Sequence, residues 1–301
     1  MAKARAIVKR RKAVRNIRKI TKTMQMIATA KFQKSLKRTV AGKPYALKMR
    51  ELVAELARAV EDVSHPLLRR PTAGDCSGRI ALVVITSNRG LAGAYNGNVL
   101  RKAMHFIGEQ ESSGKKSDLL VAGKKGNSYF NFQKRPITQR LEIGDTPRFE
   151  DVAQVANWLM EQFVEGHYDA VHVAYMNFLS AGVQKADVIS LLPLAGLEAA
   201  GGARPKGGTA GPAAAAIYDF IPDAKTLLDE LLPSAVRGAL FQAFLEATAS
   251  EHVARMVAMK SATDNADKMT KSLTMRYNRA RQAQITTELS EIMGGVEAMK
   301  K

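Results

Sequence analysis

Residues 239–293 read ALFQAFLEATASEHVARMVAMKSATDNADKMTKSLTMRYNRARQAQITTELSEIM and contain neither glycine nor proline. Because these two residues interrupt helices most strongly, the stretch predicts one helix of about 55 residues, roughly 80 Å long. Its apolar face is traced at helical spacing by Leu240, Phe244, Met256, Met259, Thr263, Ala266, Leu273, Tyr277 and Ala280. So narrow a face cannot stabilise a helix of this length alone, since most helical stability in proteins comes from packing against a partner.

The beginning of the chain offers that partner. Residues 3–41 also lack glycine and proline, although Arg10 and Lys31 occupy places where apolar residues are expected. A coiled-coil-like seam with spacings of three, four and seven is formed by Ile7, Val14, Ile17, Thr21, Met24 and Ala28. Gly42-Lys43-Pro44 predicts a kink or a break before the pattern resumes up to residue 63. We therefore expect residues 1–65 and 223–301 to form a long antiparallel coiled coil.

The middle of the chain, residues 75–195, has a different pattern. Short apolar runs at 79–86, 119–122, 137–141, 170–175 and 187–192 predict strands, and residues 96–109, a segment through 129, and 149–165 predict helices. This alternation indicates a Rossmann-like α/β domain with a mostly parallel sheet. The two terminal helices can meet only if this domain lies at one end of them. Residues 196–222, rich in glycine and alanine, are predicted to be a low-complexity linker or loop.

The charge of the chain is concentrated at its beginning. The net charge is +18, and no aspartate or glutamate precedes Glu51. Such a segment favours an acidic partner, which can be a nucleic acid, an anionic lipid surface or an acidic protein. The single cysteine, Cys76, excludes an internal disulfide and is typical of a reducing compartment. The apolar run at 80–85 is too short to cross a bilayer, and residues 2–38 resemble an organised helix more than a targeting presequence.

Four stretches carry a resemblance to a known family. They are RMVAMKSATDNA at 255–266, YNRARQAQITTEL at 277–289 followed by Glu291-Ile292, ITKTMQMIATAK at 20–31, and ITSNRGLAG at 85–93 with Asn96. In this order they resemble the gamma subunit family of F-type, proton-transporting ATP synthases, over nearly the whole chain.

The resemblance implies a mechanical function without a catalytic, cofactor or metal site in this chain. Members of the family form the central stalk, a rotor that turns inside a ring of alpha and beta subunits and contacts the epsilon subunit and the c-ring. Rotation couples ion translocation to ATP synthesis or hydrolysis at the beta subunits. The resemblance also implies a peripheral position on the cytoplasmic face of a bacterial plasma membrane, with membrane contact only through the complex. Whether protons or sodium ions drive the rotor stays open.

The resemblance also identifies candidate coupling residues. Met24 matches the position where the rotor meets a beta subunit, and Arg281 and Gln282 match polar contacts to a loop that holds the rotor. The remaining candidates are Lys31, Arg255, Lys260, Thr286 and Glu288. Each could instead be a packing residue or part of a solvated helix face. The sequence departs from the family in two places. No cysteine pair lies near 190–215, so the redox-regulated chloroplast form is not supported, and residues 199–216 look like an insertion without a role we can name.

Several other signals are weaker. Gly90-Leu91-Ala92-Gly93 lacks the full dinucleotide-binding pattern and predicts a tight turn, and residues 108–117 have the wrong spacing for a P-loop. The five histidines show no metal-ligand or catalytic spacing. The main alternative is a nucleic-acid-binding protein that uses its basic N-terminal helix, although only Phe32 and Tyr45 could stack on bases there. A cytoskeletal or tethering coiled coil would leave the α/β domain unexplained.

Overall fold

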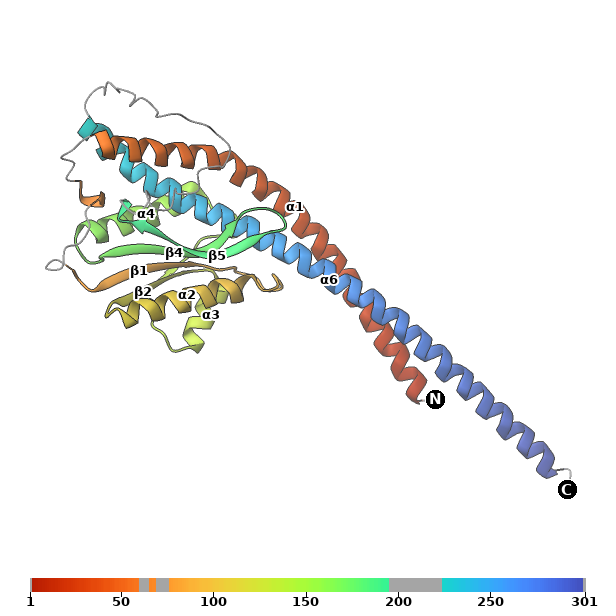
Figure 1. Cartoon of the computed structure of the whole chain (residues 1–301). Helices are drawn as coiled ribbons and strands as arrows, with labels where there is room; N and C mark the ends of the chain where they lie inside the picture. Colours follow the sequence, from red (N-terminus) through yellow and green to blue (C-terminus); the bar gives the residue numbers. More distant parts are fainter. Residues whose placement is uncertain (1, 60–64, 69–75, 195–223, 300–301) are drawn as a thin grey trace, which may run out of the picture. The chain divides into compact units, whose positions relative to one another are not determined.

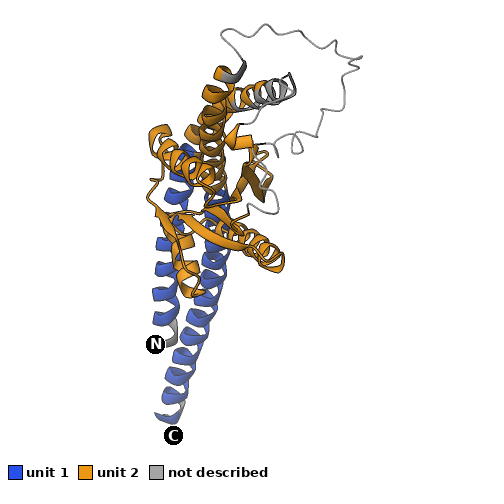
Figure 2. Cartoon of the chain, turned by 90° about the vertical axis from the view of Figure 1, so that its left-hand side faces the viewer, with its two compact units in different colours: residues 1–31, 254–301 blue, residues 32–253 orange. Residues whose placement is uncertain are grey.

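The computed structural model describes residues 2–59, 65–68, 76–194 and 224–299. The predicted linker at 196–222 lies outside these residues. The chain divides into two compact units, one made of residues 1–31 and 254–301 and the other of residues 32–253 (Figure 2). Two long helices, α1 (Ala2–Ala59) and α6 (Ala224–Met299), contribute to both units. The boundaries predicted from the sequence, which divide the chain into residues 1–65, 75–195, 196–222 and 223–301, remain a prediction.

The first unit is an antiparallel pair of helices, which Figure 2 shows side by side. Residues later in α1 contact residues earlier in α6, as expected for antiparallel helices. The Arg11 guanidinium lies 5.1 Å from the Tyr277 ring centre, and the Thr21 and Thr263 hydroxyls are 2.8 Å apart. Between them Val14 packs with Ala266 and Leu273. The expected antiparallel coiled coil is therefore confirmed.

The seam of this coiled coil differs from the predicted one. On α1 the buried positions are Val14, Thr21 and Ala28, which recur every seven residues. Ile17 and Met24, which were expected on the same seam, are 53% and 38% exposed. Their placement in the seam is wrong, because α6 encloses a single narrow row of α1 and leaves the neighbouring rows outside.

Helix α1 continues through Gly42 and Pro44 to Ala59, so the chain does not leave the helix there, and the predicted kink near residues 42–44 remains a prediction. Pro44 has no N–H to donate to the carbonyl of Val40, which normally weakens a helix. Within the second unit, however, α1 packs on α6 across this region. The Thr39 hydroxyl donates to the Leu245 carbonyl (3.2 Å), and Gly42 lies so close to Gln242 that a Cβ would stand 3.0 Å from its amide oxygen. These contacts hold α1 helical on both sides of the proline.

The second unit is built on a five-stranded sheet. Its strands are β1 (Arg79–Ile85), β2 (Lys116–Ala122), β3 (Gln139–Leu141), β4 (Ala170–Phe178) and β5 (Gln184–Leu192). They lie in the order β3-β2-β1-β4-β5, and every pairing is parallel except β4 with β5. The short connection between β4 and β5 can only reverse the chain, since a parallel pairing needs a long crossover. The expected mostly parallel sheet is confirmed.

Helices cover both faces of this sheet (Figure 1). One face, which includes Val83 of β1, shares a core with α4 (Phe149–Val164) and with residues 228–247 of α6. The other face is covered by α2 (Tyr95–Ser112) and α3 (Lys124–Phe132), and the short helix η1 (Pro66–Leu68) adds Leu67 to the first core. Six consecutive residues of β1 are buried for this reason, which is typical of a strand enclosed on both faces.

Candidate functional site

The surface of α1 in the first unit is strongly basic. Residues 5–31 include ten lysines and arginines, of which all but Arg11 are exposed. Two of them reach across to α6: Arg11 lies over the Tyr277 ring, and the Arg18 side chain is 2.5 Å from the Asp267 carboxylate. The Arg18 pair is about half exposed, so it contributes little to stability. The other positive charges project into solvent around the helix and form a surface suited to an acidic protein partner.

An exposed apolar stripe runs along the same part of α1. Ile17, Ile20, Met24 and Ile27 recur at spacings of three and four, and each is at least 38% exposed. This is the spacing of a coiled-coil seam, yet the chain's own partner helix encloses a different row. Met24 therefore lies in an outward-facing apolar row rather than in the core. Sequence reasoning missed Ile20 and Ile27 as members of this row, although their spacing was visible.

The last turns of α6 carry a second apolar stripe. Ile285, Leu289, Ile292, Val296 and Met299 repeat the spacing of four and three, and their exposed fractions lie between 48% and 88%. In the first unit they extend beyond the last described contact between the two helices, at Arg11 and Tyr277. The end of α6 thus presents apolar side chains around a helix that is also polar and charged on its other faces.

The predicted coupling residues fall into two groups in the first unit. Thr21 and Thr263 face each other, so Met24, three residues after Thr21, shares one level of the antiparallel pair with Lys260, three residues before Thr263. Lys31 and Lys260 are exposed, and Arg255 is partly buried. The second group, Arg281, Gln282, Thr286 and Glu288, lies on the exposed end of α6.

Contacts within the second group are local to the helix. Gln284 donates to the Glu288 carboxylate (2.8 Å), and the Thr286 hydroxyl donates to the Gln282 carbonyl (2.9 Å). Such contacts between residues four apart stabilise an exposed helix by a few tenths of a kcal/mol each. They order the side chains on the helix surface but do not enclose a cavity. The candidate residues therefore form a surface, not a binding pocket.

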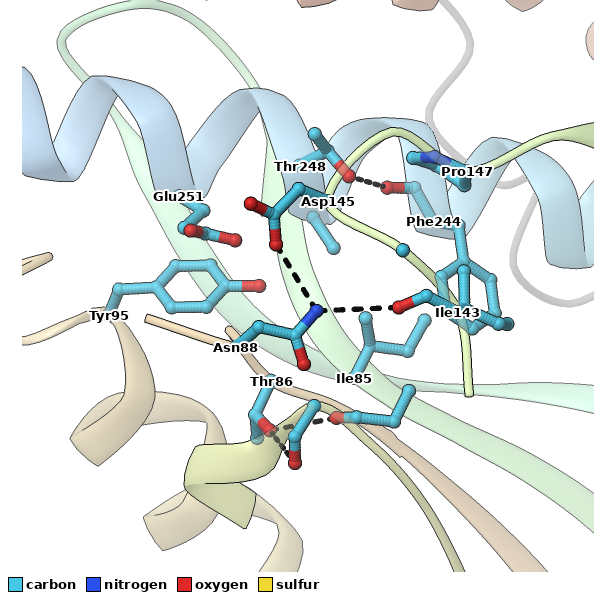
Figure 3. A pocket seen from close by; sticks show the side chains of 14 residues that line it. Ile85, Thr86, Asn88, Tyr95, Ile143, Asp145, Pro147, Phe244, Thr248 and Glu251 are labelled. Atoms are coloured by element: carbon cyan, nitrogen blue, oxygen red, sulfur yellow. Dashed lines mark hydrogen bonds between the residues drawn. The ribbon is translucent and has the colours of Figure 1, made fainter. Parts of the chain in front are cut away.

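The fourth resemblance stretch, at the end of β1, forms a polar network in the second unit (Figure 3). The Asn88 amide donates to the Asp145 carboxylate (3.2 Å) and to the Ile143 carbonyl (3.4 Å), and Arg89 lies 3.1 Å from the other Asp145 oxygen. Figure 3 shows Asp145 and Glu251 on the same side of a small pocket that Tyr95 closes from one end. This network ties the loop after β1 to the segment between β3 and α4.

The N-terminus of α3, where a phosphate could bind in related folds, is occupied by the protein itself. The Lys124 N–H donates to the Asn88 side chain (3.2 Å), the Lys125 N–H to the Ser87 carbonyl (3.1 Å), and the Gly126 N–H to the Thr86 hydroxyl (2.9 Å). A phosphate site needs such N–H groups to be available. The first three N–H groups of α3 are therefore not available to a phosphate, whereas the turn predicted at Gly90-Leu91-Ala92-Gly93 precedes a different helix, α2.

The described residues give no sign of metal or membrane chemistry. Among them, no group of three or more histidine, cysteine, aspartate or glutamate side chains could hold a metal ion. No helix in the described ranges is both long and apolar enough to span a bilayer. His172 is partly buried on β4 beside Phe106, and its removal from solvent, together with the charge of Lys115, lowers its pKa to about 4.

Comparisons with known proteins cover the whole chain. A family model described as ATP synthase matches residues 3–299. The ATP synthase gamma chain of Rhodopirellula baltica is 40% identical over 301 residues and covers all of both chains. The ATP synthase gamma chain of Leptospira biflexa is 41% identical over 99% of this chain and all of its own length.

Solved structures show the same fold at lower identity. A chain in the cryo-EM structure of the Euglena gracilis mitochondrial ATP synthase, which includes OSCP, F1 and the c-ring in rotational state 3, aligns with a TM-score of 0.63 at 20% identity. The alignment covers 99% of this chain and 95% of that one. A chain of the central stalk and c-ring structure of the Tetrahymena thermophila enzyme aligns with a TM-score of 0.57 at 22% identity, over 81% of this chain and 99% of its own.

Proposed function

The chain belongs to the ATP synthase gamma chain family, and on this premise we propose that it is the central rotor of a bacterial F-type ATP synthase. Its two terminal helices would turn inside a ring of alpha and beta subunits, and the second unit would contact the epsilon subunit and the c-ring. Rotation would couple ion translocation to ATP synthesis and hydrolysis. The nucleic-acid-binding alternative is not favoured, because the family match extends over the entire chain.

One observation supports this proposal most directly. The first unit is an antiparallel helix pair that encloses a narrow row of side chains and directs its charged side chains and many apolar ones outward. A pair of helices built in this way resists bending along its length, and it offers a different surface on each side. A rotor needs both properties, because it must transmit torque and must present unequal faces to equivalent partners.

The electrostatics of α1 suit the beta subunits that the family's rotors contact. A rotor can change a partner's conformational equilibrium only by binding its states with different free energies. Moving an equilibrium from 1:99 to 99:1 requires about 5.5 kcal/mol, whereas an exposed charge pair contributes about 0.2–1 kcal/mol. Several contacts must therefore act together, which is consistent with ten basic residues between positions 5 and 31 and an apolar row beside them.

Within this surface we assign contact functions to the candidate residues. Met24 and Lys260, at one level of the pair, would contact a beta subunit together with Lys31 and Arg255. Arg281, Gln282, Thr286 and Glu288 would contact the part of the ring that holds the end of α6. The Arg281 guanidinium is suited to such a contact because its fixed array of donors can bind a carboxylate or several carbonyl oxygens.

The remaining parts of the proposal concern catalysis and location. We propose that the chain carries no catalytic residue and acts on the reaction only through the beta subunits. We also propose that it lies on the cytoplasmic side of the plasma membrane, attached to it through the rest of the complex.

A rotation experiment tests the proposal. The chain is assembled with alpha and beta subunits of the same organism, the ring is fixed to a surface, and a probe is attached at Cys76, which is exposed and is the single cysteine. Addition of ATP should produce stepwise rotation in one direction, and rings assembled without the chain should show none. A ring that binds the chain and hydrolyses ATP while the probe stays still would contradict the proposal.

A further inference from the structure

A buried pair of hydroxyl groups joins the two helices of the first unit. The Thr263 hydroxyl lies 2.8 Å from the Thr21 hydroxyl, and the two residues are only 7% and 8% exposed. All other side-chain contacts described across this interface involve apolar groups or partly exposed charges. This hydroxyl pair is therefore the buried directional contact between α1 and α6 in the described part of the unit.

The hydrogen bonds of the pair are complete without water. Thr21 is also 3.1 Å from the Arg18 carbonyl, and Thr263 is 2.8 Å from the Met259 carbonyl. Each hydroxyl has one proton, so one threonine donates across the interface while the other donates to a carbonyl of its own helix. In either arrangement both protons are used and no buried donor is left without an acceptor.

In the first unit the rest of the seam is mostly apolar, while in the second unit the Thr39 hydroxyl also joins the two helices at the Leu245 carbonyl. On α1 the buried row consists of Val14, Thr21 and Ala28 at a uniform spacing of seven residues. Apolar contact is not directional, so the apolar part of the row opposes a shift of seven residues along α6 only through the fit of side-chain sizes. The pair of Arg18 and Asp267 is half exposed and contributes too little to prevent such a shift.

We propose that Thr21 and Thr263 are positioning residues that fix the axial register of α1 against α6. A buried polar pair at a seam position selects one register, because in any other register its cross-helix hydrogen bond is lost. The register in turn determines which outward side chains share a level, such as Met24 with Lys260. The inference rests on the proposed rotor function only for this last consequence, since the register is a property of the helix pair itself.

Two pairs of substitutions separate the hydroxyl group from packing. Thr21→Val with Thr263→Val keeps the shape of both side chains and removes the hydrogen bond. Thr21→Ser with Thr263→Ser keeps the hydroxyls and removes a methyl group from each. As a matched control, Thr29→Val with Thr270→Val removes one hydroxyl from each helix, and these hydroxyls bond only to their own helices, at the Gln25 and Ala266 carbonyls.

The register is measured on the full chain by the distance between two spin labels. Labels at Lys9→Cys and Ser261→Cys, both exposed, are placed in a chain carrying Cys76→Ser. A shift of seven residues displaces the helices by roughly 10 Å along their axes. We expect one distance in the parent and serine chains. The valine pair should raise the ratio of shifted to native register about fivefold, the preference that one net hydrogen bond supplies.

The thermal stability of the valine pair should be unchanged or raised, since two apolar groups of the same shape replace a buried polar pair. In the reconstituted complex, ions pumped per ATP should fall for the valine pair and stay at the parent value for the serine and control pairs. A valine pair with a single unshifted distance and parent coupling would overturn the inference. If the parent chain itself supports no coupling, the proposed function fails, and the spin-label distances still decide the register.

Discussion

Replacing Gly126 by alanine should destabilise the second unit strongly, because the first turn of α3 is packed against the end of β1. A Cβ at this position would stand 2.7 Å from the Thr86 hydroxyl oxygen and 2.7 Å from a methyl group of Val121. Carbon atoms essentially do not approach other atoms so closely, so Thr86 or the helix must move. Thr86 is poorly able to move, since its hydroxyl donates to the Ala122 carbonyl (2.8 Å) and accepts from the Gly126 N–H (2.9 Å).

The magnitude follows from these contacts. Loss of two buried hydrogen bonds costs about 2 kcal/mol, and overpacking costs about 1–3 kcal/mol. The better helix propensity of alanine returns about 1 kcal/mol. We expect a net loss of about 2–4 kcal/mol in the free energy of unfolding. In a chain that also carries Thr86→Ala the clash with Thr86 is relieved and only the contact with Val121 remains, so the two substitutions together should cost less than the sum of their separate effects.

The assay is urea unfolding followed by the fluorescence of Trp158, the single tryptophan, which lies on α4 and packs near Tyr168 in the second unit. Gly108→Ala is the matched control, because Gly108 is also in a helix and a Cβ there meets no atom within 4 Å. It should be neutral or stabilise by up to about 1 kcal/mol. A loss below about 1 kcal/mol for Gly126→Ala, or full additivity with Thr86→Ala, would refute the reasoning.

Two further predictions concern coupling and pH. Met24→Lys adds a positive charge to the exposed apolar row of α1 and should lower the number of ions pumped per ATP about two- to fivefold, the effect of one exposed contact. The control is Met26→Lys, which adds the same charge about 200° around the helix. An equal loss in the control would contradict the assignment of Met24. His172→Phe should reduce the loss of stability in acid. In the folded chain the pKa of His172 is about 4, whereas in the unfolded chain it is near 6.5. Stability that is present above pH 6.5 is therefore lost as the pH falls toward 4, by about 3 kcal/mol in total. Urea midpoints between pH 7 and pH 4 measure this, and the exposed His105→Phe should follow the parent chain.

Much of the fold could be predicted from local sequence, because its elements are long or fully enclosed. The glycine-free stretch at 239–293 lies within α6, and the apolar run at 80–85 lies within β1. Strand ends were less certain: β5 begins at Gln184, three residues before its predicted start. An edge strand is covered on one side only, so polar residues such as Gln184 and Lys185 can belong to it without an apolar signal.

The inward face of α1 could not be decided from the sequence. Two rows on this helix have coiled-coil spacing, one with Val14, Thr21 and Ala28 and the other with Ile17, Ile20, Met24 and Ile27. Hydrophobicity alone favours the second row, which contains the larger side chains. The partner helix contributes Thr263 and Ala266, and the small row fits against them. The row of α1 that faces α6 is therefore determined by the fit between the side chains of two segments far apart in the sequence, which the pattern of one helix alone does not display.

The same limit applies to the polar network after β1. Asn88 and Asp145 lie 57 residues apart in the chain, and their contact depends on the parallel order of β1, β2 and β3. The candidate coupling residues came from resemblance, and the structure adds their exposure and level but does not test their function. Long-range polar contacts carry no periodic signal, so sequence patterns alone could not have identified this pair.

The hydrogen bonds at the start of α3 connect this helix directly to the loop after β1. Asn88, Ser87 and Thr86 accept from the N–H groups of Lys124, Lys125 and Gly126, so these N–H groups are not available to a phosphate. A variant designed to bind a phosphate at this helix end would first have to lose these three hydrogen bonds. It would then also lose the connection between α3 and the loop after β1.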